Sequence, residues 1–340
     1  MGLGGYLTWT AVARELKQRD PERPIVFTTS PSFWNRLRGR PHGAPIDSEV
    51  FAHNPHLTPA KDLRPSDDPR YVWLDDPQYR YHSLITREHV RFKSGGHIIE
   101  LLCRQFDITH PRLQCELFLT EDERGKAADL TSGWSRFLTV EPHAKADFTA
   151  NKGWAFERWQ AVVEGLGREC RIVQVGVGGK PVLRGVTDMT GQLTFRQTAA
   201  LIGRSALLLS TEGGLTHAAN AVGTRAVVVY GGYQPPSPTA YPGNINLYAD
   251  ISCAPCGLRV PCPIGLQCMG LITPDHVIEA ARTILAESRS RACETMASQT
   301  RIVIPPGERP GQERMLPREP VALIRVRWRA AKPQPVAGRC

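Results

Sequence analysis

Residues 206–230 constrain the fold more than any other part of this sequence. A short apolar run at 206–209 leads into Thr-Glu-Gly-Gly-Leu-Thr-His at 211–217, and residues 226–230 are again apolar and β-branched. Short, continuous apolar runs of this kind are typical of strands that are buried on both faces. The small residues at 218–222 suit a helix that packs closely on a sheet. The stretch therefore predicts one parallel βαβ unit.

The loop of this unit has the chemistry of an anion site. Gly213 and Gly214 precede the helix, so backbone N–H groups and the positive end of the helix dipole point to one place, which suits a diphosphate. Glu212 ends its strand at the edge where open α/β sheets bind ligands, and its carboxylate can accept hydrogen bonds from sugar hydroxyls. His217 falls in the first helical turn. The alternative is a tight turn with a structural histidine.

The surroundings of this loop resemble the nucleotide-sugar domain of glycosyltransferase family 9, the heptosyltransferase family. The family pattern is Asp-x-Thr-Gly, a helix, a strand and then Asp-Thr/Ser-Gly-x-x-His. Asp188-Met-Thr-Gly and a helical pattern at 195–202 stand upstream of the loop. Glu212 takes the acidic position and Gly213 the small one, while Gly214, Leu215 and His217 match in register. The resemblance covers roughly residues 136–286 and is weaker before them.

The resemblance implies an α/β fold of the GT-B type, with two Rossmann-like domains whose parallel sheets face across a cleft. We expect an acceptor-side domain at residues 1–133 and a nucleotide-sugar-binding domain at 134–288. Residues 289–340 are a basic Arg/Pro-rich tail that we expect to be mostly disordered, although 321–326 could pair as a strand.

The implied reaction is transfer of a sugar, with heptose as a candidate, from a nucleoside-diphosphate donor to an acceptor hydroxyl. An ADP-sugar is the expected donor, and lipopolysaccharide or another surface glycan or glycolipid is the expected acceptor. The residues expected to bind the nucleotide-sugar are Gly4, Gly5, Lys152, Glu212, Gly213, Gly214, Leu215, Thr216 and His217. Tyr79, Tyr81 and His82 are candidates for stacking on the acceptor, with a structural role as the alternative.

Lys152 precedes Gly-Trp, which resembles the Lys-x-Trp of the family, whose lysine contacts the donor phosphate. A lysine is suited to this task as a point charge. The alternative is a solvated loop lysine. With Lys152 and helix ends to neutralise the leaving diphosphate, catalysis requires no metal.

The first glycine loop departs from the family pattern. The family loop reads Gly-Asp-x-Leu, and its aspartate is the proposed general base, but Gly5 occupies that position here. Glycine cannot accept a proton, so we expect His97, at the head of a predicted helix at 97–106, to be the catalytic base. The alternative is a surface or capping histidine.

Four cysteines raise the question of a metal. Cys253, Cys256, Cys262 and Cys268 could close a tetrahedral zinc site or bind iron, and in a cytoplasmic protein their spacing favours metal over disulfides. The same cysteines are also a recurrent feature of heptosyltransferases that need not bind metal. They therefore remain candidate metal ligands, with free thiols as the alternative.

The basic charge of the chain belongs to its C-terminal end. Of the net charge of +9, residues 289–340 contribute +7 from 11 basic and 4 acidic side chains, which leaves +2 for the first 288 residues. The body thus gives no electrostatic case for binding nucleic acid. No apolar run approaches the ~20 residues of a membrane span and no signal peptide is visible. We expect a cytoplasmic protein, with peripheral contact at the inner face of the membrane as an open alternative.

Two other function classes remain open. Gly5 is compatible with a catalytically impaired glycosyltransferase-like binding protein. The cysteines are compatible with a metal-dependent assembly protein. Donor turnover separates the first from an enzyme, and metal analysis tests the second.

Overall fold

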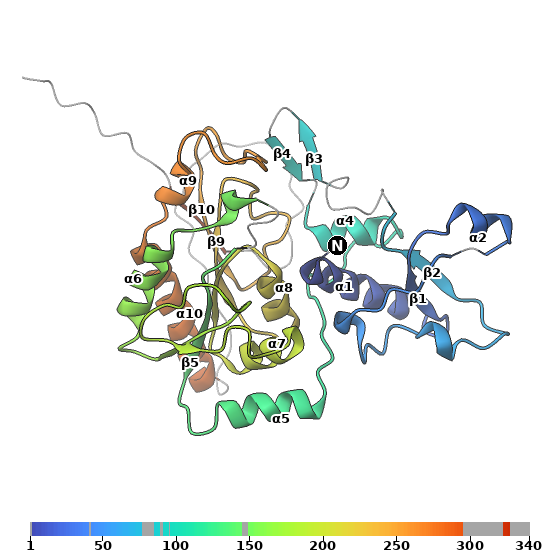
Figure 1. Cartoon of the computed structure of the whole chain (residues 1–340), viewed down its shortest axis with the longest axis horizontal. Helices are drawn as coiled ribbons and strands as arrows, with labels where there is room; N and C mark the ends of the chain where they lie inside the picture. Colours follow the sequence, from blue (N-terminus) through green and yellow to red (C-terminus); the bar gives the residue numbers. More distant parts are fainter. Residues whose placement is uncertain are drawn as a thin grey trace, which may run out of the picture.

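The structure is a computed structural model that describes residues 2–40, 42–76, 85–88, 91–94, 96–144, 149–294 and 322–326. Two units are visible, one built on a large sheet and a smaller one that packs beside it (Figure 1). The predicted α/β class with parallel sheets is confirmed. Within the described residues, no helix combines the length and apolar character needed to cross a bilayer.

In the part of the chain that the structure describes, the large sheet has seven strands, and every pairing between them is parallel. Its spatial order is β11 (Ala322–Val326), β10 (Ile245–Ala249), β9 (Ala226–Tyr230), β8 (Leu208–Thr211), β5 (Phe137–Glu141), β6 (Arg171–Gln174) and β7 (Thr187–Asp188). The stretch at 321–326, for which strand pairing was left open, forms β11, which pairs with β10.

Two helical layers cover the large sheet because its strands are apolar on both faces. On one face, α7 (Phe195–Arg204) and α8 (Gly214–Ala221) pack against side chains such as Leu208. On the other, α6 (Phe156–Leu166) and α10 (Pro274–Glu294) pack against its neighbour Leu209. The predicted βαβ unit is therefore confirmed as β8–α8–β9.

The smaller unit is organised around α1 (Leu3–Arg19), whose middle turns are buried. Its sheet, in the described part of the chain, is the parallel pair of β1 (Ile25–Thr28) and β2 (Arg70–Trp73). The remaining elements are α2 (Phe33–Leu37), the 3-10 turns η1 (Glu49–Phe51) and η2 (Ala60–Asp62), the antiparallel hairpin of β3 (Ile85–Glu88) and β4 (Arg91–Ser94), and α4 (Ile98–Arg104).

One of the two hydrophobic core clusters is shared by both units. Leu7, Trp9 and Val12 of α1 belong to the same buried cluster as Leu215 and Ala218 of α8. Figure 1 shows α1 lying against α8, on the side of α8 that faces away from the sheet. Apolar burial across the junction fixes the smaller unit against the start of α8.

The connection between the units runs through α5 (Glu121–Leu130), which packs along α7. Buried Arg196 of α7 binds the Glu123 carboxylate through two nitrogens, at 2.6 and 2.8 Å, and donates to the carbonyl oxygens of Glu49 and Phe118. One guanidinium thus joins α7, α5 and the smaller unit. The division at residues 133/134 and the start of the tail at 289 stay predictions.

Candidate active site

Lys152 and Glu212 meet at the carboxyl edge of the large sheet. Glu212 follows the last residue of β8 and is 9% exposed. Lys152 ends the 3-10 turn η4 (Ala150–Lys152), and its Nζ forms an ion pair with Oε2 of Glu212. The same Nζ lies 5.2 Å from the ring centroid of buried Tyr233, a favourable cation–π position. The structure therefore brings together two residues that the sequence assigned to the donor.

The segment that contains the cysteines positions Lys152 through its neighbour Asn151. The buried Asn151 amide donates to the carbonyl oxygens of Leu258 and Val260, at 2.9 and 2.8 Å. Its own Oδ1 accepts a 3.1 Å hydrogen bond from the backbone N–H of Cys262. These three bonds fix the turn on which Lys152 sits.

Two helix N-termini converge beside this ion pair. α8 begins after Gly213 and α1 after Gly2, and neither start has a side-chain cap. A Cβ on Gly4 would lie 3.0 Å from Cα of Gly214 and 2.9 Å from Cδ2 of His217, so only glycine permits this approach. The positive ends of both helix dipoles therefore act on the same small region.

The remaining residues of the predicted donor site serve mainly as support. Gly5 lies in the first turn of α1, and its carbonyl oxygen accepts from Thr8 Oγ1. Leu215 points into the shared core. Thr216 Oγ1 donates to the Gly213 carbonyl at 2.7 Å, so its hydroxyl proton is already used within the loop. In this loop it is the backbone that is available to an anion.

His217 belongs to a buried network that spans both units. Its Nδ1 lies 2.5 Å from the Tyr241 hydroxyl, which also lies 3.1 Å from Sγ of Cys115. Burial lowers the pKa of His217 to about 4, because loss of hydration and the Lys152 charge outweigh the attraction of Glu212. His217 is therefore neutral near pH 7 and adds no charge to the site.

His97 caps α4 and is buried at the same junction. Its Nδ1 accepts from the backbone N–H of Ile99 at 3.2 Å, and its ring centroid lies 5.1 Å from that of Tyr241. Burial and the nearby His217 lower the pKa of His97 to about 3. Since Nδ1 is an acceptor, the proton of the neutral ring is on Nε2, a buried atom that has no hydrogen-bond partner among the described residues. Such a ring is neutral but only weakly basic.

Glu141 is a candidate site residue that sequence reasoning missed. It ends β5 opposite Ser210 of β8, and Ser210 Oγ donates to its Oε2 at 3.2 Å. Desolvation raises the pKa of Glu141 to about 7, although the Ser210 bond acts in the opposite direction. A carboxyl group that is often neutral at this edge can lie close to phosphate without full repulsion. The sequence signal that could have identified Glu141 was its position at the end of a predicted strand.

The raised pKa predicts how stability depends on pH. The pKa of Glu141 is about 7 in the folded protein, against an ordinary value of 4.5. Stability therefore falls as pH rises between these two values and is level above them. Glu141→Gln keeps an acceptor for Ser210 but carries no charge. We expect it to stabilise the fold at pH 8 by about 1–3 kcal/mol and hardly at pH 4.5.

Thermal unfolding at both pH values measures this difference. Glu123→Gln is the matched control, because the hydrogen bonds from Arg196 hold the pKa of Glu123 below its ordinary value. The control should destabilise the fold at pH 8. Equal melting temperatures of Glu141→Gln and wild type at pH 8 would contradict the assignment.

The four candidate cysteines lie in one segment of the large unit, and metal binding by them stays a prediction. Cys253 is exposed, Cys256 and Cys262 are partly buried, and Cys268 is buried with Sγ accepting from the backbone N–H of Gly232 at 3.2 Å. Over the described ranges, no three His, Cys, Asp or Glu side chains are placed to hold a metal ion. Three hydrogen bonds to Asn151 hold the segment against η4.

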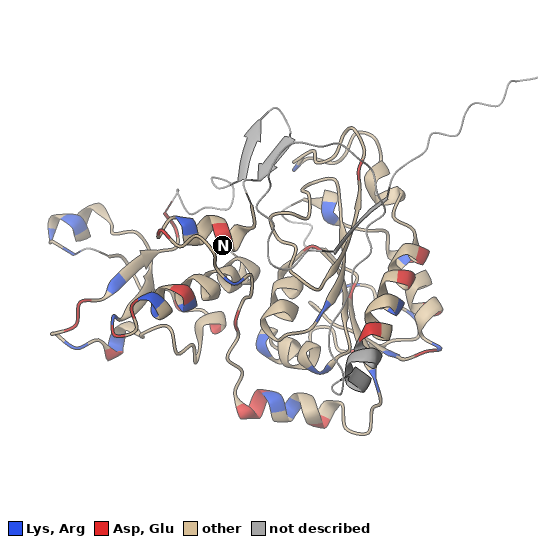
Figure 2. Cartoon of the chain, turned by 180° about the vertical axis from the view of Figure 1, so that it is seen from behind, with Lys and Arg blue, Asp and Glu red and all other residues tan. Residues whose placement is uncertain are grey.

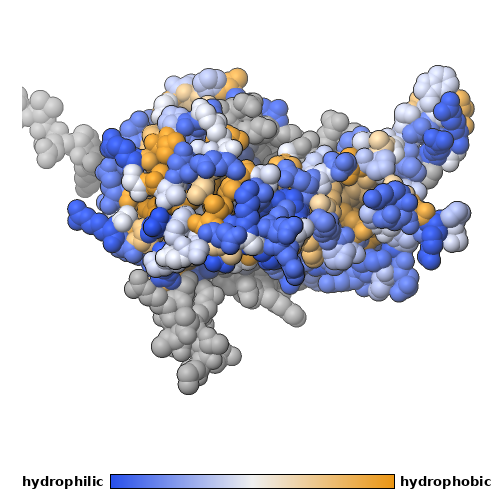
Figure 3. All heavy atoms as spheres, turned by 60° about the horizontal axis from the view of Figure 1, so that its bottom comes forward, coloured by the Kyte–Doolittle hydropathy of each residue, from blue (hydrophilic) through white to orange (hydrophobic). Residues whose placement is uncertain are grey.

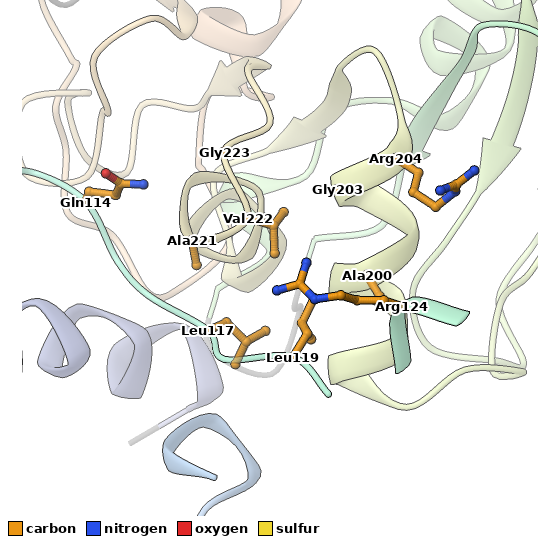
Figure 4. Close-up of a pocket in the computed structure, with 10 residues that line it drawn as sticks. All are labelled: Gln114, Leu117, Leu119, Arg124, Ala200, Gly203, Arg204, Ala221, Val222 and Gly223. Carbon is orange, nitrogen blue, oxygen red and sulfur yellow. The ribbon is translucent and has the colours of Figure 1, made fainter. Parts of the chain in front are cut away.

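A pocket of about 440 Å³ lies away from these residues (Figure 4). Its lining includes Leu117 and Leu119 of the connection, Arg124 of α5, and the C-terminal ends of α7 and α8 at Arg204 and Val222. It therefore lies at the other end of α8 from Gly214 and Glu212, and we do not assign the donor to it. Tyr79, Tyr81 and His82 lie outside the described residues.

Comparison with known families decides the identity of the chain. Residues 70–261, more than half of the 340, match the model of the family described as glycosyltransferase family 9 (heptosyltransferase). The chain belongs to glycosyltransferase family 9. It is thus a sugar-transferring enzyme, and the binding-protein and assembly-protein alternatives have no support. No curated protein sequence matches the chain.

Solved structures of this family share the fold. E. coli ADP-heptose LPS heptosyltransferase II matches 85% of this chain and 97% of its own, at 14% identity and a TM-score of 0.56. A family 9 glycosyltransferase from Veillonella parvula matches 84% of this chain and 95% of its own, at 16% identity and a TM-score of 0.56. The iron-containing dodecameric glycosyltransferase TibC of enterotoxigenic E. coli matches 85% of this chain and 75% of its own, at 13% identity and a TM-score of 0.54. At these identities the matches show the GT-B fold alone.

Proposed function

We propose that this glycosyltransferase takes a nucleoside-diphosphate sugar at the Lys152–Glu212 edge and transfers the sugar to an acceptor hydroxyl. The convergence of Lys152 with the starts of α1 and α8 is the observation that carries the proposal. A departing diphosphate needs several positive groups on one side, and these supply them without a metal ion. Glu212, already paired with Lys152, is placed to accept from sugar hydroxyls once phosphate takes over the lysine.

We further propose ADP-heptose as the donor and a lipopolysaccharide-type or other surface glycan as the acceptor. Two neighbours in structure support this choice: E. coli ADP-heptose LPS heptosyltransferase II, and the complex of TibC with ADP-D-β-D-heptose. An acceptor of this kind would place the protein in the cytoplasm, at the inner face of the membrane.

A turnover screen tests the proposal. The full chain is incubated with ADP-, GDP- and UDP-sugars and a lipopolysaccharide core acceptor, and release of the free nucleoside diphosphate is followed. The proposal predicts acceptor-dependent release from an ADP-sugar. Nucleotide release from none of the three donor classes contradicts it.

His97 was predicted to be the catalytic base, and a pair of variants tests that role. Asparagine caps helices as well as histidine does but cannot accept a proton, whereas alanine removes the cap at a cost of about 1 kcal/mol. The hydrogen bond to Ile99 and the low pKa favour the capping role. We therefore expect His97→Asn to keep turnover within a few-fold and His97→Ala to lower the melting temperature. A loss of about 10²-fold in His97→Asn with donor binding intact would restore His97 as the base.

A further inference from the structure

Helix α2 presents its apolar side chains to solvent. Phe33, Trp34 and Leu37 are 72%, 63% and 69% exposed, and no residue of the helix is buried. The rings of Phe33 and Trp34 lie edge to face, 5.6 Å apart. Figure 1 shows α2 projecting from the end of the smaller unit that is farthest from the large sheet. Clustered exposed groups of this size mark an interaction surface.

We call the loop between Thr29 and Gly43, which carries α2, the tip, and the hydrogen-bonded base of this loop the neck. Thr29, just after β1, donates to the Ala44 carbonyl at 2.8 Å and accepts from the Gly43 N–H at 2.9 Å. Within the tip, Asn35 Nδ2 donates to the His42 carbonyl at 3.2 Å. The fold therefore holds the apolar side chains outward on a closed loop.

The same tip is cationic. Arg36, Arg38 and Arg40 are all exposed, and residues 23–46 contain no Asp or Glu. The carboxylate beside the loop is Asp75, which is bonded to Ser30 at the neck. Figure 2 shows blue Lys and Arg segments without red on this projection, and Figure 3 shows apolar groups at its outer edge next to hydrophilic ones.

We propose that α2 docks on an anionic lipid bilayer. Phe33, Trp34 and Leu37 would enter the boundary between headgroups and acyl chains, where aromatic rings are favoured. Arg36, Arg38 and Arg40 would bind anionic headgroups. The tip is a convex projection of one short helix, too small for a stable dimer interface, which needs about 800 Å² from each partner. This inference does not depend on the transfer reaction.

Vesicle co-sedimentation of the full chain tests the docking surface. Wild type should bind phosphatidylcholine vesicles that contain phosphatidylglycerol, bind pure phosphatidylcholine more weakly, and release as salt rises. The triple variant Phe33→Ser/Trp34→Ser/Leu37→Ser should lower the partition coefficient about tenfold or more. Arg36→Gln/Arg38→Gln/Arg40→Gln should remove the preference for anionic vesicles. Val177→Ser, which changes a 69% exposed side chain of the large unit, is the matched control.

The depth to which α2 enters the bilayer is measured through the fluorescence of Trp34. Brominated lipid should quench part of the wild-type tryptophan fluorescence, and Trp34→Phe should keep binding but lose that quenching. Wild type that ignores vesicles, or α2 variants that bind like wild type, overturn the proposal. Dimers that the serine variant disperses would assign the tip to a second copy and overturn it too. Calorimetry of nucleotide-sugar binding by the same variants shows whether the donor site is intact. It therefore separates failure of membrane docking from failure of the proposed function.

Discussion

Lys152→Met should lower turnover about 10²–10³-fold, because one well-placed charge on a developing anion is worth that much in a dry site. In the free protein the ammonium group is held by Glu212 and by the Tyr233 ring. When a diphosphate arrives it can exchange Glu212 for phosphate oxygen. Nucleotide release by the purified variant, at saturating donor, measures the effect.

Part of this loss would come from the Glu212 charge that is left without its partner. The double variant Lys152→Met/Glu212→Gln removes that charge and should recover some donor affinity but little turnover. Lys126→Met, which changes a lysine of α5 bonded to Gln197, is the control and should match wild type. Turnover of Lys152→Met within threefold of wild type would exclude this lysine from the phosphate site.

Arg196→Met should destabilise the fold by about 3–5 kcal/mol, or roughly 6–15 °C in melting temperature. Arg196 is 5% exposed, and its removal leaves the Glu123 carboxylate and the carbonyl oxygens of Glu49 and Phe118 without their donor. These groups belong to α5, to the smaller unit and to the connection. Their joint loss should loosen the two units as well as lower the melting temperature.

Arg184→Met is the matched control for Arg196. Arg184 pairs with Glu164 at 3.2 Å, but their side chains are 82% and 60% exposed. Exposed pairs contribute about 0–1 kcal/mol, so the control should melt close to wild type. Equal shifts for the two arginine variants would show that the buried junction is not what holds α5 and the smaller unit to α7.

The sequence predicted those parts of the molecule that local pattern determines. The β8–α8–β9 unit was predicted because continuous apolar runs and a glycine loop are local features. Glu212 was assigned to the donor from its place at the end of a predicted strand, and Lys152 from family resemblance. Their direct contact was not predicted, because it joins segments sixty residues apart in the chain.

What the sequence did not predict depends on long-range contacts. Arg196 was not singled out in the sequence, and only the fold shows its four hydrogen bonds to Glu123, Glu49 and Phe118. The Cys253–Cys268 spacing suggested metal, but it gave no sign of the hydrogen bonds that join Asn151 to Leu258, Val260 and Cys262 about a hundred residues away. Glu141 gained its raised pKa from tertiary burial, which no spacing in the sequence shows.

The most direct test of the donor site compares a nucleotide-sugar with its bare nucleotide on one variant. Calorimetry is performed with ADP-heptose and with ADP, on wild type and on Glu212→Ala. If Glu212 binds the sugar, the variant should lose about tenfold or more in affinity for ADP-heptose. It should bind ADP at least as well as wild type, because Lys152 is released for phosphate. Equal losses for the two ligands, or no binding of ADP-heptose to wild type, would contradict the account.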